Sequence, residues 1–256
     1  MTDAQPWIDA LRNSHERLAK LVAGLDADDV RSPSYAKEWT IADVLSHLGS
    51  GAEHHRLMLD AALTGGEAPG GEQMQPIWDR WNAKSPDEKA ADVIPTDAAT
   101  VQRLLALTDA ERASAHLTWI GMEFDLAGVV GTRLAEHAVH TWDVAVMREP
   151  GAVVSADAVS VLIDTVLRTA RWAAKPSEKA FTLAVTTTEP AREFTLRGGE
   201  TPALTAGATE EADGSLTLSA EQLIRLVYGR LDDAEDAVLA ADGITFDDLR
   251  TVFPGF

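Results

Sequence analysis

The spacing of apolar residues changes near Pro150 and Gly151, and this change limits the possible folds more than any other feature. Before it, apolar side chains recur at intervals of three and four residues, as on amphipathic helices. After it, stretches appear in which apolar residues alternate with Thr and other polar residues, as in half-buried strands. The sequence therefore predicts an α+β fold, with a helical domain at 1–150 and a small mixed α/β domain at 151–256.

Four main helices are expected in the first domain, at about 7–25, 41–63, 97–107 and 125–148. Thr40 precedes the second of them, and its hydroxyl can cap a free amide of the first turn. The segment 65–95, rich in Gly, Pro and charge, predicts a long connection with a short helical piece near 76–83. Four helices with one long crossover would pack as a bundle.

The second domain shows signals of both strands and helices. Ser155 is placed to cap a helix that reaches about Ala173. The stretches 181–188 and 192–198 alternate like a pair of neighbouring strands. Further along, the sequence SLTLSAEQLIRLVYGR predicts a strand followed by a helix that Ser219 caps and Gly229 ends.

Charge and cysteine content exclude several functions. The 41 acidic residues against 22 Lys and Arg give a formal charge of −19 spread along the chain, which disfavours DNA or RNA as a partner. No apolar run approaches the length of a membrane span, and the first residues lack the features of a signal peptide, so we expect a cytoplasmic protein, a monomer or a small homo-oligomer. Because the chain has no cysteine, any thiol chemistry must use an imported thiol.

Two expected helices carry residues that can bind a metal ion. Glu136 and His140 lie one helical turn apart, so their side chains can converge on one atom. The second helix presents His47, and on the same face Gly51 would leave room beside it while His54 is a spare ligand. Two His and one Glu suit a divalent metal, with zinc the first candidate, and leave a position open for water or substrate.

The other candidates have simpler interpretations as well. A His on an amphipathic helix is usually a hydrogen-bonded or surface residue, and the spacing of EHAVH alone is weak evidence for a metal. His137 is the first substitute ligand because it lies three residues from His140, and Asp143 is placed to orient a ligand through a hydrogen bond. The remaining histidines are expected to have no role in the site: His15, His55 and His116. The tryptophans expected in the core are Trp39, Trp119 and Trp142.

Two motifs together resemble a known family. EWTIADVLSHLG at 38–49 and RLAEHAVHTWDVA at 133–145 are similar to the mycothiol-dependent maleylpyruvate isomerase family, within the wider DinB-like group of metal-dependent thiol transferases. The resemblance implies a DinB-like bundle with zinc on His47, Glu136 and His140, and mycothiol as the thiol. The segment LSAEQLIRLVYGRL at 218–231 looks like the small α/β domain of that family, similar to sterol-carrier folds, and Arg230 then stands where a basic residue handles an anionic substrate.

The chemistry expected from this resemblance is activation of a thiol. A metal with two neutral ligands and one carboxylate keeps a net positive charge and lowers the pKa of a bound thiol. Transfer of the thiolate to an electrophile would make the protein a mycothiol S-transferase, for which His54 and Asp143 are expected near the thiol and Arg230 near the electrophile. The same site could instead isomerise maleylpyruvate, hydrolyse a substrate, or serve a non-catalytic binding protein.

Overall fold

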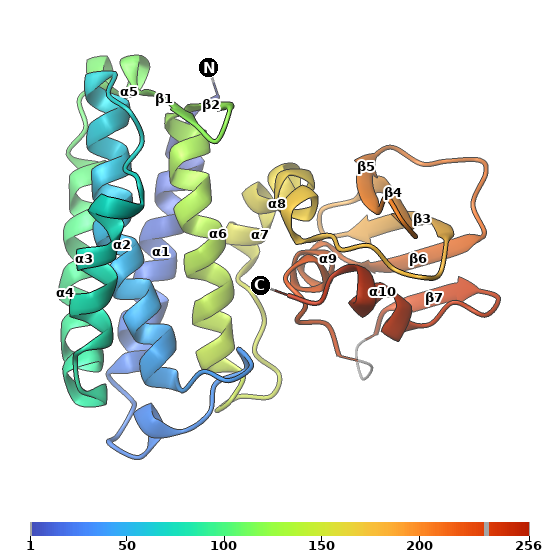
Figure 1. Ribbon diagram of the computed structural model, residues 1–256, viewed down its shortest axis with the longest axis horizontal. Coiled ribbons are helices and arrows are strands. Elements are labelled where there is room, and N and C mark those ends of the chain that lie inside the picture. The colour runs from blue at the N-terminus through green and yellow to red at the C-terminus, as the bar shows by residue number, and fades with distance from the viewer. Residues whose placement is uncertain (1, 233–235, 256) are drawn as a thin grey trace. The chain divides into compact units, whose positions relative to one another are not determined.

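The computed structural model describes residues 2–232 and 236–255, and these form two compact units that divide between Val154 and Ser155 (Figure 1). The first unit is mainly helical. Its elements are α1 (Gln5–Val22), η1 (Asp29–Arg31), α2 (Ile41–Thr64), α3 (Gly71–Asn82), α4 (Pro86–Leu105), α5 (Asp109–Ser114), β1 (His116–Trp119), β2 (Met122–Asp125) and α6 (Leu126–Ala145).

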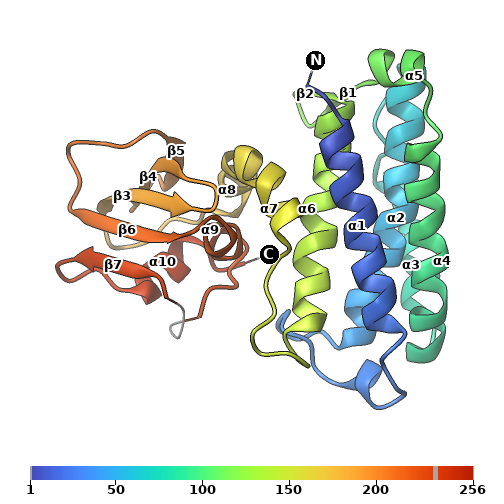
Figure 2. The ribbon, with the colours of Figure 1, turned by 180° about the vertical axis from the view of Figure 1, so that it is seen from behind.

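Four long helices of the first unit form the bundle. Going around it, the order is α1, α6, α2, α4, and each helix packs against its two neighbours in that order. Figure 2 shows the bundle from behind, with α1 beside α6. Two connections therefore cross the bundle diagonally, from α1 to α2 and from α4 to α6, where the sequence predicted one crossover. At the centre, α2 packs its apolar face against Trp81 of α3, which is fully buried.

The predicted connection at 65–95 is wrong, because most of it is helical. Helix α4 begins nine residues before Pro95, at Pro86. Just before it, the Ser85 hydroxyl accepts a hydrogen bond from the Glu88 amide, and the Glu88 carboxylate accepts one from the Ser85 amide. Pro95 removes one amide from the helix, yet burial of Val93, before it, and Val101, after it, holds both halves in one helix. Packing of the apolar face thus outweighed the helix-breaking signal.

A short hairpin precedes α6 and was not predicted. β1 and β2 pair antiparallel, with Leu117 opposite Phe124 and both side chains buried. Ile120 and Gly121 form the turn with positive φ angles of 47° and 74°. With only four residues in each strand, the alternation is too short to be recognised in the sequence.

The second unit is an α/β domain built on a mixed sheet. Its elements are α7 (Ala156–Leu162), η2 (Ile163–Thr165), α8 (Val166–Ala173), β3 (Phe181–Thr188), β4 (Arg192–Gly198), β5 (Ala203–Ala206), β6 (Gly214–Ser219), α9 (Ala220–Val227), β7 (Val238–Ala241) and α10 (Phe246–Val252). The strand order is β5-β4-β3-β6-β7, with β3 and β6 parallel and the other neighbours antiparallel. The α+β fold class, a bundle followed by a small sheet domain, is confirmed.

The local predictions for this unit are confirmed in most places. The strands β3 and β4 pair as expected, and the side chain of Ser219 caps α9 by accepting from the amide of Gln222. Ser155 precedes α7, but its side chain makes no capping hydrogen bond, and a 3-10 turn divides the helix predicted up to Ala173. Across both described ranges, no helix combines the length and the apolar character needed to cross a membrane.

Candidate metal centre

The start of each of two helices positions the candidate ligands. In α2, Thr40 accepts from the amide of Asp43 and the Asp43 carboxylate accepts from the Thr40 amide, so the helix begins at Ile41 and places His47 in its second turn. In α6, the Asp125 side chain accepts from the Gly128 amide. These helices pack against each other in the bundle, which brings residue 47 to the turn containing 136 and 140.

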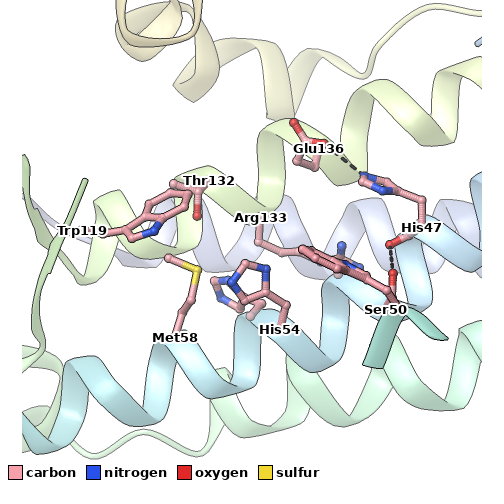
Figure 3. Close-up of a pocket in the computed structure, with 11 residues that line it drawn as sticks. His47, Ser50, His54, Met58, Trp119, Thr132, Arg133 and Glu136 are labelled. Atoms are coloured by element: carbon pink, nitrogen blue, oxygen red, sulfur yellow. Dashed lines mark hydrogen bonds and ion pairs between the residues drawn. The ribbon is translucent and has the colours of Figure 1, made fainter. Parts of the chain in front are cut away.

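The three predicted ligands lie together. Glu136 Oε2 is 3.2 Å from His47 Nε2 and 3.6 Å from His140 Nε2. One ligand atom from each residue lies within 4.8 Å of the others. Figure 3 shows Glu136 on α6 facing His47 across the gap between the two helices.

This donor set fits a divalent metal ion. Zinc binds imidazole nitrogen and carboxylate oxygen at about 2.0–2.1 Å, and tetrahedral angles then put neighbouring donors about 3.3 Å apart. The two measured separations, 3.2 and 3.6 Å, bracket that value. The side chains of His47 and Glu136 are 37% and 43% exposed, so the cluster is open to a further ligand from solvent.

Asp143 fixes the orientation of one ligand. Its Oδ2 lies 2.8 Å from His140 Nδ1, and its side chain is fully buried. Since a carboxylate can only accept, Nδ1 donates to it, and in the neutral ring Nε2 then carries no proton and is directed at Glu136. Such a carboxylate behind a histidine is a common way to orient a metal ligand.

We expect Asp143→Ala to weaken divalent-metal binding by roughly 10- to 100-fold, because the His140 ring loses the acceptor that fixes its tautomer. Competition with a chromogenic chelator measures the affinity directly. Asp9→Ala, at an exposed carboxylate of α1, serves as the control and should bind metal like the wild type. Unchanged affinity in Asp143→Ala would reject the orienting role.

The charges of the cluster match those of a metal site. Partial burial would raise the pKa of Glu136, but the interactions of its carboxylate with the His140 and His47 rings outweigh this effect and hold that pKa well below its usual range. Burial lowers the pKa of His47, and its bond to Glu136 only partly compensates. At neutral pH the cluster thus offers an ionised carboxylate and at least one neutral imidazole, the forms that bind metal.

Tryptophans expected in the core lie at the site instead. Trp39 is 37% exposed, and its ring stacks on His140 at 5.8 Å between centroids and tilts against His47 at 5.3 Å. Trp119 lines the adjacent pocket. Of the three predicted core tryptophans, only Trp142 is buried, with its indole nitrogen donating to the carbonyl of Ala152. Spacing could not reveal this, because a residue just before a helix can face either the core or the site.

A pocket opens beside the ligand cluster, between α2 and α6. Its lining comes mostly from the α2 face predicted to carry His47, with α6, α3 and β1 contributing the rest. The lining residues are His47, Ser50, Gly51, His54, His55, Met58, Trp78, Trp119, Thr132, Arg133 and Glu136. In Figure 3, Met58, Thr132 and Trp119 form the end away from Glu136, and His54 lies between the two ends.

Other predicted residues have different surroundings. His137 is not a substitute ligand: it is fully buried, and its Nε2 lies 2.9 Å from Asp97. His55, expected to have no role, lines the pocket. Arg230 belongs to the second unit, where it is buried and donates to the backbone carbonyl of Tyr228, so its role toward a substrate stays a prediction.

Sequence reasoning missed a buried charge network behind the pocket. Asp97 accepts from Arg133 at 2.8 Å, from His137 at 2.9 Å and from His15 at 2.8 Å. Arg133 also donates to the backbone carbonyl of Leu48. The available signal was Arg133 as the lone charged residue among the first ten residues of α6, which indicates a buried ion pair. No sequence pattern identifies Asp97 as its partner.

The chain thus belongs to the class of helical-bundle proteins with a candidate metal centre. In its four-helix bundle, two histidines and a glutamate meet at a pocket, and a small sheet domain follows the bundle. The sequence profile of the mycothiol maleylpyruvate isomerase N-terminal domain matches residues 11–145, more than half of the 256 residues. The chain therefore belongs to this family, and the resemblance inferred from the two motifs is confirmed.

The fold is shared with a solved structure, and a second solved structure shows a weaker similarity. The crystal structure of the mycothiol-dependent maleylpyruvate isomerase is similar with a TM-score of 0.66 at 15% identity, covering 92% of this chain and 93% of that one. YfiT from Bacillus subtilis, described as a probable metal-dependent hydrolase with an unusual four-helix bundle topology, has a TM-score of 0.45 at 17% identity over 59% of this chain and 91% of that one. None of the curated proteins compared matches the sequence.

Proposed function

We propose that this protein is a metal-dependent enzyme that activates mycothiol as a thiolate and transfers the whole thiol to an electrophile, forming a thioether. The observation that carries the proposal is the cluster of His47, Glu136 and His140, whose donor atoms have the spacing of a metal site with an open side. Membership of the mycothiol maleylpyruvate isomerase family supports mycothiol as the thiol. A metal ion held here would lower the pKa of a thiol at its open position.

The residues around the cluster have distinct tasks in this proposal. Asp143 holds His140 in the tautomer that leaves Nε2 free for the metal. Trp39 covers the two histidine rings on one side and limits access of water. The sugar hydroxyls of mycothiol find polar partners among Ser50, His54 and Thr132, which line the pocket.

Isomerisation is the second candidate, favoured by the family to which the chain belongs. Both reactions begin when the sulfur forms a bond to a carbon of a conjugated double bond and the π electrons move onto the activating group. In transfer, the adduct takes up a proton and is released. In isomerisation, the sulfur leaves with its electron pair after rotation, so the double bond returns and the thiol is regenerated.

Turnover with a halogenated bimane, from which the sulfur of mycothiol displaces a halide ion, tests the proposal. With mycothiol present, the purified protein is expected to form the mycothiol–bimane adduct faster than the uncatalysed reaction, and His47→Ala should lose most of this rate together with its metal. Counting mycothiol separates the two reactions, since transfer consumes one thiol per product and isomerisation of maleylpyruvate consumes none.

Two controls make the result decisive. Omitting mycothiol must abolish turnover, because thiol-independent product formation indicates hydrolysis by the metal site. His116→Ala, at an exposed histidine of the hairpin, should keep the full rate. Neither metal nor turnover in the wild-type protein would leave a non-catalytic binding protein as the better account.

A further inference from the structure

Two buried nitrogen atoms draw attention to one part of the pocket. Among the described residues, only His55 Nε2 and Arg133 Nε are buried side-chain nitrogen or oxygen atoms without a hydrogen-bond partner. Both residues line the pocket beside the metal-ligand cluster. Buried polar groups are nearly always paired in folded proteins, so two unpaired groups in one pocket indicate a missing polar ligand.

Arg133 is held so that part of its guanidinium stays available. One nitrogen, Nη2, donates to Asp97 and to the carbonyl of Leu48, which fixes the side chain from behind. Of the described residues that line the pocket, Arg133 alone is a lysine or arginine. Figure 3 shows it in the middle of the pocket, between Glu136 and Met58.

Gly51 makes the close approach of this guanidinium possible. A Cβ atom at position 51 would lie 2.8 Å from Arg133 Nη1, too close for an ordinary contact. The missing side chain therefore leaves room for Arg133, although the sequence suggested room beside His47. Gly51 itself lines the pocket, so Nη1 reaches the pocket wall at this point.

The charges around Arg133 favour a negatively charged ligand, because the histidines near it are neutral. Burial, followed by the charge of Arg133, lowers the pKa of His55 to about 3, and the same causes lower that of His54. Both rings are thus neutral at pH 7, and Arg133 supplies the fixed positive charge. A guanidinium and a neutral imidazole in its N–H tautomer, both lining one pocket, match the two oxygens of a carboxylate.

We propose that Arg133 and His55 form a subsite for a carboxylate group of the electrophilic substrate, with Gly51 admitting the guanidinium. This inference rests on the proposed function for the presence of an electrophile, but the subsite does not require a metal. The apolar end of the pocket at Met58 and Trp119 would receive the substrate's carbon skeleton. Arg133 is thereby a specificity-determining residue, on the same helix as two metal ligands.

Calorimetric titration with benzoate and benzamide tests the subsite, because the two probes share one ring and differ in charge. The wild-type protein is expected to bind benzoate about tenfold or more tighter than benzamide. Arg133→Lys keeps a cation for Asp97 but loses the forked donors, and should bring the two affinities to within about twofold. Gly51→Ala should reduce the preference for benzoate several-fold, since the new Cβ displaces Arg133 Nη1. Any steric effect of this Cβ on the bound benzene ring is the same for both probes.

Two further variants identify the group that binds the carboxylate. Trp78→Phe changes another pocket residue and should keep the preference. His140→Ala, whose metal content is measured in parallel, should also keep it, because Arg133 acts without the metal. A preference that vanishes in His140→Ala yet survives in Arg133→Lys and Gly51→Ala would place the carboxylate on the metal and overturn the inference while supporting the metal site.

Absence of any preference in the wild-type protein would also overturn the inference, and water would then account for the unpaired nitrogens. If circular dichroism shows that Arg133→Lys fails to fold, Gly51→Ala decides the matter, since alanine favours a helix and its Cβ would meet only guanidinium atoms of Arg133 and no backbone atom. A wild-type protein that lacks metal but prefers benzoate would support the subsite and reject the proposed function.

Discussion

His140→Ala is expected to lower the bound metal from about one ion per chain to nearly none, because His140 supplies the one ligand that a buried carboxylate orients. Elemental analysis of protein purified without chelators measures the content. His116→Ala is the matched control: its side chain is exposed in the hairpin and pairs with Glu123, so the metal content should not change. Equal metal in wild type and His140→Ala would reject the assignment of the ligands.

Metal binding at this site should also change the thermal stability of the protein. Binding to the folded state alone raises the unfolding temperature, so added zinc should stabilise the wild-type protein and have little effect on His140→Ala. This second measurement separates a specific site from surface binding, which would stabilise both proteins alike. Metal identity needs its own test, because a site of two imidazoles and a carboxylate accepts several divalent ions after purification.

Asp97→Ala is expected to lower the free energy of unfolding by about 3–5 kcal/mol, because it leaves the buried Arg133 without its counter-charge. Chemical denaturation followed by circular dichroism measures the loss. Asp87→Ala on the same helix is the control: that exposed carboxylate pairs with Arg31, and its removal should cost less than about 1 kcal/mol. A similar small cost at both positions would contradict the structural role of Asp97.

The pH dependence of stability gives an independent test of Asp97. Burial would raise its pKa, but the charges and hydrogen bonds of His137 and Arg133 outweigh burial and hold the pKa well below its usual range. A lowered carboxylate pKa stabilises the folded state above the unfolded-state value of 3.8 and loses this effect as the pH falls toward the folded-state pKa. Asp97→Ala should therefore lose less stability than the wild type on acidification below about pH 4.

Much of the candidate site could be predicted because its signals are local. The spacing of Glu136 and His140 is a property of one helix, and so are the capping residues that begin α2 and α6. One stripe of residues on α2 was predicted to face the site. His47, Gly51 and His54 from that stripe line the pocket beside α6. That these residues bind a metal stays a prediction.

The remainder could not be predicted, because it depends on contacts between distant segments. Helix α4 runs through Pro95 because its two halves share a buried face, which outweighs a local signal for a break. Asp97 lies on that helix, and its partners His15, Arg133 and His137 come from two others. No spacing within one segment shows that four such residues share one buried site.

The sequence by itself determined the α+β class, the starts of α2 and α6 and the pair of candidate ligands on α6, because apolar period, capping and one-turn spacing act over a few residues. Only the tertiary structure decided that His47 lies with Glu136 and His140, that Asp97 pairs with one nitrogen of Arg133 and that two buried nitrogens of pocket residues stay unpaired. Those features follow from which helix faces meet in the bundle, a choice made by the packing of the whole core.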